Sequence, residues 1–273
     1  MCLIVIATLS HPDYPLVIAA NRDEFYFRPS APLSFWEDHA GGMADVLAGR
    51  DLQGQGTWLG VTTGGRFAAI TNYREPNTID MGAVSRGLLV SNFLVSDMLP
   101  ETYLKAIADS GETYNGFNLV AGHILDSKWQ VSPSLWWYSN KKNEMLNIPP
   151  GIHAISNHLI DTPWPKTRKT TEGIRKILAD QNPIDPETIF SLLSDTDRPS
   201  DAELPDTGVG LEWERVLSSI FVVSPVYGTR SSAVILVDRS GLLTFFERTF
   251  TSGALPPATE ATREFEIRLK PGG

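Results

Sequence analysis

The sequence has one cysteine, fewer basic than acidic residues and no long apolar run. The single cysteine lies at position 2 of 273 residues. Because there is only one, the chain can form neither an internal disulfide nor a cysteine-rich zinc site. The 23 lysine and arginine residues face 32 aspartate and glutamate residues, a formal net charge of -9. Nucleic-acid binding relies on a positive surface, so we expect no nucleic-acid partner.

Stable membrane insertion is not expected either. No stretch approaches the roughly 20 apolar residues that a bilayer-spanning helix needs. The apolar start is about as long as a signal-peptide core, but no basic segment precedes it. A strand, a turn over 11–15 and a second strand explain this start better. We therefore expect a cytoplasmic protein.

Motifs for metal, phosphate and serine-hydrolase sites are lacking. The five histidines have no standard metal-ligand spacing, and no P-loop is present. The glycine-rich segment 54–60 lacks the lysine of a phosphate loop and is typical of a turn before a strand. Gly-x-Ser-x-Gly is absent. We expect no metal and no cofactor.

The residues that are abundant indicate a packed interior. Hydrophobic residues make up 42% of the chain and aromatic residues 10%, including seven tryptophans. The length suits one large domain or two small ones, and neither an internal repeat nor a linker divides it. We expect a single domain over residues 1–273.

Short β-like runs dominate the hydrophobic pattern. They cover 3–9, 15–20, 57–62, 66–71, 117–122, 135–139, 154–156, 220–224, 233–238, 242–248 and 264–269. Glycine-containing turns at 63–65 and 238–241 predict two hairpins. Helical spacing covers 88–98, 102–108, 164–178 and 186–193, the last with Asp185 as its N-cap. Residues 195–210 read as a long surface loop. Hairpins without β-α-β alternation predict an α+β fold with antiparallel sheets and segregated helices.

Cys2 is the first candidate for chemistry. A lone cysteine on an apolar strand is often a small buried hydrophobe. However, a cysteine at position 2 allows removal of Met1, which would leave a thiol and a free α-amine on one residue. Their ordinary pKa values, about 8.5 and 7.7–8.0, would let the amine act as base toward the thiol.

Polar residues follow the second predicted strand abruptly, at 21–25. They could simply be a solvated strand end. Alternatively, the second strand pairs with the first and delivers Arg22 and Asp23 beside Cys2. Arg22 would then favour the thiolate, and Asp23 could orient the α-ammonium group.

Motifs spread over nearly the whole chain resemble those of the NRDE family, which includes the transport and Golgi organisation protein 2 group. They are Met1-Cys2, Asn21-Arg22-Asp23-Glu24-Phe25, Arg28-Pro29, Gly56-Thr57-Trp58-Leu59-Gly60, Thr71-Asn72-Tyr73-Arg74, Ser85-Arg86-Gly87, Tyr114-Asn115-Gly116-Phe117-Asn118-Leu119, Ser156-Asn157, Thr162-Pro163-Trp164-Pro165-Lys166 and Tyr227-Gly228-Thr229-Arg230-Ser231.

The resemblance implies a fold and a catalytic set. Members of this family resemble N-terminal-nucleophile hydrolases of the penicillin V acylase and bile salt hydrolase type. This implies a four-layer αββα sandwich with two mainly antiparallel sheets. Position by position, it implies Cys2 as nucleophile, Arg22 and Asp23 beside it, Asn72 as oxyanion donor, Asn157 as second asparagine and, as a weaker match, Arg230. In the acylases the arginine and the aspartate are separated in the sequence, whereas Arg22 and Asp23 are adjacent here. Because adjacent strand residues point to opposite faces, it stays open whether both side chains can face the site.

The expected reaction is acyl transfer from a small acylated substrate. Cys2 would attack a carbonyl, and the Asn72 amide with a backbone N–H would hold the oxyanion. Asn21, Trp58, Tyr73 and Arg74 are candidate substrate contacts. For Trp58 a role in the core or rim, and for Arg74 a surface ion pair, are the alternatives.

A second function is compatible with the same resemblance: a non-catalytic protein that binds and moves haem, acyl-coenzyme A or another lipid. Cys2 or a histidine might then ligate haem iron, although no Cys-Pro or Cys-x-x-Cys-His element is present. Scaffold alone does not decide between the two functions. The sequence identifies neither the ligand nor the oligomeric state.

Overall fold

The computed structural model describes residues 2–36, 45–180, 183–251 and 258–270, with Cys2 described through its strand backbone. Over these residues, the first of two sheets has six strands. Their order is β10 (Gly151–Ile155), β1 (Cys2–Thr8), β2 (Leu16–Phe25), β11 (Tyr227–Val237), β12 (Leu242–Phe250) and β13 (Thr259–Arg268).

The second sheet has seven strands over the same described residues. Their order is β3 (Ser30–Phe35), β4 (Val46–Asp51), β5 (Leu59–Thr62), β6 (Arg66–Asn72), β7 (Phe117–Leu125), β8 (Val131–Ser139) and β9 (Glu144–Asn147). Neighbouring strands pair antiparallel in both sheets.

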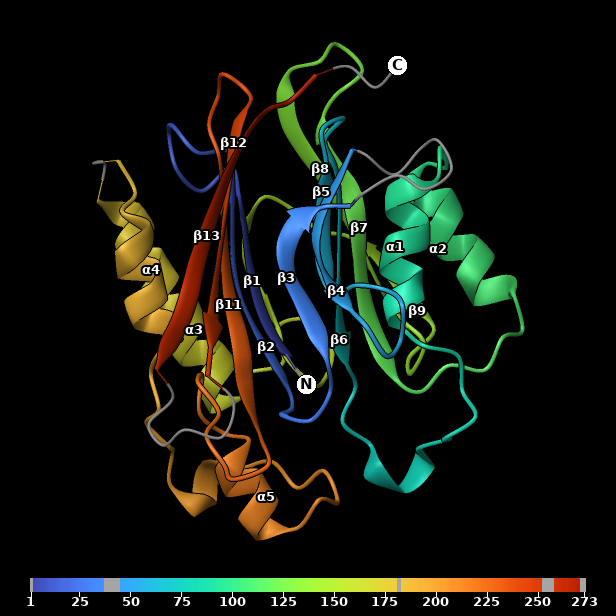
Figure 1. Ribbon diagram of the computed structural model, residues 1–273, viewed down its shortest axis with the longest axis vertical. Helices are drawn as coiled ribbons and strands as arrows, with labels where there is room; N and C mark the ends of the chain where they lie inside the picture. The colour runs from blue at the N-terminus through green and yellow to red at the C-terminus, as the bar shows by residue number, and fades with distance from the viewer. Residues whose placement is uncertain (1, 37–44, 181–182, 252–257, 271–273) are drawn as a thin grey trace.

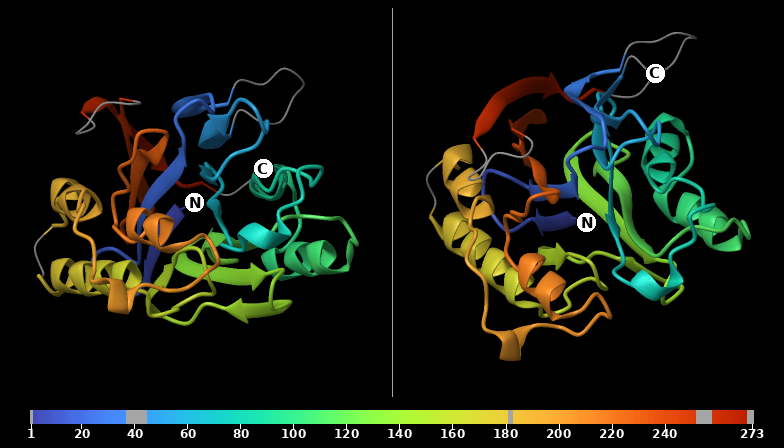
Figure 2. Two further views of the ribbon diagram at one scale, coloured as in Figure 1. Left: turned by 90° about the horizontal axis from the view of Figure 1, so that it is seen from below. Right: turned by 60° about the horizontal axis from the view of Figure 1, so that its bottom comes forward.

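Helices cover the outer face of each sheet, which gives four layers (Figure 1). On the first sheet they are α3 (Pro165–Ala179) and α4 (Pro186–Leu193), and on the second α1 (Gly87–Val95) and α2 (Pro100–Asp109). The short helix α5 (Leu211–Val216) lies beyond one end of the layers (Figure 2). The predicted αββα sandwich is confirmed. Among the described residues, no helix is long and apolar enough to cross a bilayer.

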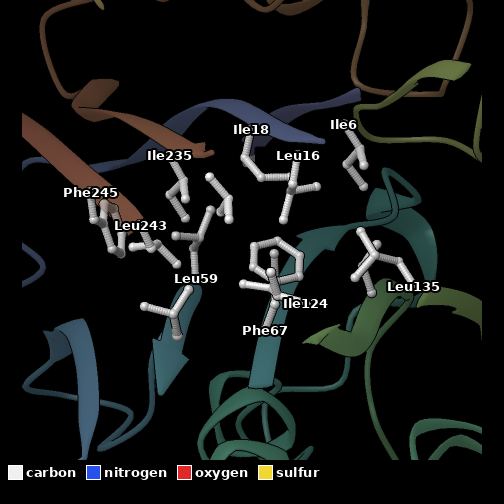
Figure 3. Close-up of a cluster of buried hydrophobic side chains, with 14 of the residues drawn as sticks. Ile6, Leu16, Ile18, Leu59, Phe67, Ile124, Leu135, Ile235, Leu243 and Phe245 are labelled. Carbon is white, nitrogen blue, oxygen red and sulfur yellow. The ribbon is translucent and has the colours of Figure 1, made fainter. Parts of the chain in front are cut away.

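Strand alternation builds three apolar layers. Ile4 and Ile6 of β1 belong to the cluster between the sheets, whereas Leu3 and Val5 pack toward the helices of the first sheet. Figure 3 shows the central layer, where residues of the first sheet such as Ile18 point toward residues of the second such as Phe67. A third cluster fills the space between the second sheet, α1 and α2.

The predicted hairpins at 63–65 and 238–241 are confirmed, and Asp185 caps α4 by accepting the Glu187 N–H. The predicted strand over 220–224 is wrong. Only an isolated bridge forms there, from Val223 to Gly228, because side chains of the first sheet bind this segment's backbone. The Thr229 hydroxyl, for example, accepts the Val222 N–H at 2.9 Å. Strands β3, β4 and β9 and helix α5 were not predicted.

At one corner, side chains of the first sheet bind the backbone of the second. A register shift in β3 lies between Ala31 and Ser34. Within it, the Leu33 N–H donates to Glu247 Oε1 at 2.6 Å, and Arg263 Nη1 donates to the Leu33 carbonyl at 3.1 Å. Glu247 and Arg263 are register partners on β12 and β13. The pair thus takes the place of a neighbouring strand at Leu33.

Candidate functional site

Strand register determines what lies beside position 2. Cys2 begins β1 and is the Cα partner of Arg22 on β2. On its other side β1 pairs with β10, and this ladder ends with Ile4 opposite Ile155. The predicted roles of the Cys2 thiol and of Met1 removal lie outside the described atoms.

Arg22 faces the space between the two sheets. Its guanidinium lies over the Trp58 ring, 4.2 Å from the centroid, and Nη2 is 3.7 Å from the Asp51 carboxylate. Although burial favours the protonated form, hydrogen bonds from the Gly54 N–H and from Arg28 hold the pKa of Asp51 below its ordinary value. Arg22 is only 5% exposed. Its buried Nη1 has no hydrogen-bond acceptor among the described residues.

Asp23 faces the opposite side of the sheet, toward the helices. It is buried, and its Oδ1 accepts the Thr229 hydroxyl at 2.7 Å. Burial raises the pKa of the Asp23 carboxyl, and the positive charge of Lys166 opposes that rise. Adjacent residues of β2 therefore serve opposite faces, as alternation requires. The acidic side chain reaches helix residues rather than the layer that holds Arg22.

Two further basic residues lie buried on the helix side. Lys166, the second residue of α3, is 3% exposed. Arg74 follows β6, and its Nη1 donates to Glu214 of α5 at 2.6 Å with both side chains buried. Glu214 in turn accepts the backbone N–H of Thr207. Acidic and basic groups alternate in this cluster, so each buried charge lies near an opposite one.

Asn157 joins the two sheets. Its side-chain Nδ2 donates to the main-chain carbonyl of Asn72 at 3.0 Å, and its Oδ1 accepts from Arg74 at 3.3 Å. The Arg74 N–H completes the link by donating to the Asn157 carbonyl at 2.8 Å. The contact therefore uses the backbone of Asn72, whose own side chain is half-buried. Asn157 and Asn72, both predicted site residues, do come together here.

Arg230 is the extra residue of a bulge in β11. Thr229 pairs with Asp23 and Ser231 with Arg22, and the register shift lies between them. Arg230 Nη1 donates to the main-chain carbonyls of three residues that connect β2 to β3: Phe25, Tyr26 and Arg28. Burial is the largest cause that lowers the pKa of Arg230, followed by the charge of Arg22. The side chain therefore fixes the connection beside the site.

The four predicted substrate contacts are spread over different surroundings. Asn21 is buried on the helix side, where its Nδ2 donates to the carbonyls of Leu193 and Ile220. Trp58 lies under Arg22, and Arg74 belongs to the buried cluster with Glu214. The half-buried Tyr73 packs against His158, with 4.9 Å between ring centroids. Among the four, only Trp58 contacts the guanidinium that faces the sheet interior.

Several residues of the site were not predicted as such. Lys166 and Thr229 stand inside motifs that carry the family resemblance, which is the signal that could have singled them out. Asp51, Glu214 and Glu247 stand outside those motifs. Burial raises the pKa of Glu247 to about 7, against the opposing charges of Arg22 and Arg263.

The interior beside Arg22 holds a small cavity of about 10 Å³, bounded by both sheets. This is the room of about one water molecule. A larger hollow of about 650 Å³ lies on the outer side of the first sheet, between β10 and α3. It is lined by residues such as Thr171 and Arg175, and neither Arg22 nor Trp58 contributes to it. The small cavity is the one that belongs to the site.

Comparison with known proteins shows which family the chain resembles. A family model described as Transport and Golgi organisation 2 matches residues 1–252. The Transport and Golgi organization protein 2 homolog of Bos taurus is 37% identical over 273 residues, covering 96% of this chain and 95% of the relative. The homolog of Homo sapiens is 35% identical over 271 residues, covering 95% of each.

Among solved structures, the mutant C2A conjugated bile acid hydrolase from Clostridium perfringens has a TM-score of 0.51 at 8% sequence identity, over 100% of this chain and 94% of that one. At that identity the likeness concerns the fold, which is that of N-terminal-nucleophile hydrolases. The motifs, the full-length match and the two-sheet architecture agree. The chain belongs to the Transport and Golgi organisation 2 family.

Proposed function

We propose that the protein is an N-terminal-nucleophile amidohydrolase or acyltransferase in which Cys2, exposed by removal of Met1, attacks a small acylated substrate. One observation carries the proposal: Cys2 is the strand partner of Arg22, a buried cation whose Nη1 has no hydrogen-bond acceptor among the described residues. A buried guanidinium favours a neighbouring thiolate and lowers its pKa. A strand that was only structural would have little reason to bury such a group.

The reaction would proceed in two steps. The α-amine takes the thiol proton, and the sulfur forms a bond to the substrate carbonyl carbon while the electron pair moves to oxygen. The C–N bond then breaks, and the α-ammonium returns the proton to the leaving amine. Water hydrolyses the thioester and restores the thiol, or an acceptor amine takes the acyl group. Asp23, next to Arg22 on β2, would orient the α-ammonium.

The remaining predicted residues divide into direct and indirect roles. The Asn72 side-chain amide would donate to the oxyanion. Asn157 is a positioning residue in this proposal, because its amide binds the Asn72 backbone. Arg230 positions the β2–β3 connection through three carbonyls. Support from outside the chain is the conjugated bile acid hydrolase with the same fold, a C2A mutant in which a cysteine at the same position of its own chain is replaced.

The decisive experiment combines intact-mass analysis of the purified protein with the pH dependence of Cys2 alkylation. We expect a mass without Met1 and an alkylation pKa well below the ordinary value of about 8.5. Cys2→Ala should unfold at nearly the same urea concentration as the wild type, yet show no turnover of acyl amides. Because the chain has one cysteine, every alkylation event reports on this residue.

Retention of Met1 would contradict the amine-base mechanism directly. The alternative function, a non-catalytic carrier of haem, acyl-coenzyme A or another lipid, predicts a different pair of results. The thiol would react slowly with an unshifted pKa, while haem would change its Soret absorbance on addition or acyl-coenzyme A would bind without being cleaved.

A further inference from the structure

The inner face of the first sheet changes character toward position 2. Three register rows cross β1, β2, β11 and β12 in succession. The first is bulky and apolar, with Ile6, Ile18, Ile235 and Phe245, all visible in Figure 3. The second is Ile4, Ala20, Ala233 and Glu247, and the third is Cys2, Arg22, Ser231 and Thr249. Two small side chains, Ala20 and Ala233, therefore lie between the bulky apolar row and the row that holds Cys2.

The small side chains of the second row leave space between the sheets. The cavity of about 10 Å³ is lined by Ile4, Ala20 and Ala233 on the first sheet and by Trp58 on the second. It has room for about one water molecule or a group of methyl size. Position 2 lies at its rim, because Ile4 follows on the same strand and Arg22, the partner of Cys2, is a lining residue.

One polar atom of this lining lacks a hydrogen bond. Arg22 is 5% exposed, and its Nη1 has no acceptor among the residues that the structure describes. Leaving such a charged donor unsatisfied costs free energy. An acceptor oxygen beside a methyl-sized group would satisfy both the donor and the apolar walls. A carbonyl oxygen on a short acyl chain has this combination.

Trp58 forms a rigid wall. One face of its ring carries the Arg22 guanidinium at 4.2 Å. The far edge packs so closely on Gly49 that a Cβ at that position would lie 2.5 Å from the ring. A ring held on two sides cannot swing aside to lengthen the cavity. Its removal would open the space toward the second sheet.

We propose that this cavity is the acyl subsite of the protein, that it restricts the acyl group to one or two carbon atoms, and that Trp58 sets the limit. The inference rests on the proposed function, since Cys2 must be the nucleophile for an acyl group to be delivered there. The methyl of an acetyl group packs on Ala20 and Ala233. Its carbonyl oxygen accepts from Arg22 Nη1 in addition to the Asn72 amide of the proposed function, and its carbonyl carbon lies toward Cys2.

The test uses p-nitrophenyl acetate, butyrate and octanoate with the full-length protein. Acylation of Cys2 is followed by p-nitrophenolate release and by intact mass. We expect acetyl transfer to exceed octanoyl transfer at least about 100-fold, since even the first misfit methylene costs a factor of roughly 10 or more in a closed pocket. Trp58→Ala should narrow that ratio at least about tenfold by accelerating octanoyl transfer.

Three further variants keep the result interpretable. Trp58→Phe retains an aromatic wall and should retain the acetyl preference. Ala233→Val fills the cavity and should slow even acetyl transfer. Trp129→Ala removes an exposed tryptophan at a distant turn and should leave the ratio unchanged. Thermal melts establish that each variant is folded.

The outcomes separate the two proposals. If wild-type Cys2 is not acylated by any of the esters, the proposed function is overturned and this inference with it. If Cys2 is acylated but octanoyl transfer equals acetyl transfer, or Trp58→Ala leaves the ratio unchanged in a folded protein, the proposed function stands and the size limit is wrong.

Discussion

Strand β2 ends with two charged residues whose surroundings differ sharply. On the helix side, Asp23 accepts a hydrogen bond from Thr229 and lies near Lys166, and Arg74 and Glu214 form a buried pair close by. On the sheet side, Arg22 touches a ring and a carboxylate 3.7 Å away, while no acceptor for its Nη1 is found in the part of the chain that the structure describes.

This difference distinguishes charged residues that stabilise the fold from a charged residue that is available to bind a ligand. Charges that hold a structure together are matched closely, because breaking one buried pair costs several kcal/mol. A group that must bind something else keeps an incompletely satisfied donor. By this criterion the helix side of β2 supports the end of the strand, and the inter-sheet side is the one proposed to receive the ligand. Three substitutions test this contrast, in order of decreasing expected effect.

Arg74→Met should give the largest loss of stability. It leaves the Glu214 carboxylate buried without its guanidinium partner, 2.6 Å away in the native protein. We expect the free energy of unfolding to fall by about 3–5 kcal/mol, as measured by urea denaturation. Lys176→Met, which breaks an exposed pair with Glu172 on α3, is the matched control and should cause no measurable change. Equal losses of stability in the two variants would contradict the conclusion that the buried Arg74–Glu214 pair stabilises this side of β2.

Glu247→Gln should change how stability depends on pH. Burial raises the pKa of Glu247 from 4.5 to about 7, so the folded protein keeps a proton that the unfolded chain releases between these values. Wild-type stability from this residue is therefore complete below about pH 4.5 and is lost as the pH rises to about 7. The loss is on the order of 3 kcal/mol.

The glutamine keeps an oxygen for the Leu33 N–H but does not titrate. Urea midpoints should therefore coincide for the two proteins near pH 4.5 and separate toward pH 8, where Glu247→Gln is the more stable. Parallel pH profiles would show that the Glu247 carboxyl ionises normally, and that the polar end of the inter-sheet layer is more hydrated than its burial indicates.

Arg22→Met should have the smallest effect on stability. It forfeits the cation–π contact with Trp58, but it also removes an unsatisfied buried donor, and Asp51 keeps Arg28 at 2.7 Å. We expect the free energy of unfolding to change by less than about 1 kcal/mol, while Cys2 alkylation near neutral pH slows. A loss as large as that of Arg74→Met would remove the contrast between the two faces.

The sequence predicted those parts of the fold that are encoded locally. Turns at 63–65 and 238–241 announce their hairpins, and Asp185 followed by proline announces α4. Strand β3 was not predicted because Pro32 interrupts its hydrophobic pattern. An edge strand such as β3 tolerates a proline. The segment 220–224 misled because its apolar pattern is that of a strand, while its hydrogen bonds go to side chains.

The residues of the candidate site also divide into those that local sequence patterns reveal and those that they do not. Arg22 and Asp23 stood out because charge follows an apolar strand. Strand alternation left open whether both could face Cys2, and in the structure they lie on opposite faces. Glu214 could not be found by such reasoning, since its partner Arg74 is 140 residues away in the chain. Likewise, nothing near Glu247 in the sequence indicates that it binds the backbone of Leu33. Contacts of this kind depend on how the two sheets pack.

The binding of Leu33 by Glu247 and Arg263 has a consequence for the specificity of folding. A carboxylate accepts only from an N–H, and a guanidinium donates only to a carbonyl. The pair therefore recognises the direction of the chain as well as its position. A β3 strand that ran the opposite way would present its carbonyl to Glu247 and its N–H to Arg263, and one that slipped by one residue would turn these groups toward the opposite edge. One accepting and one donating side chain thus encode the polarity with which one sheet is laid against the other.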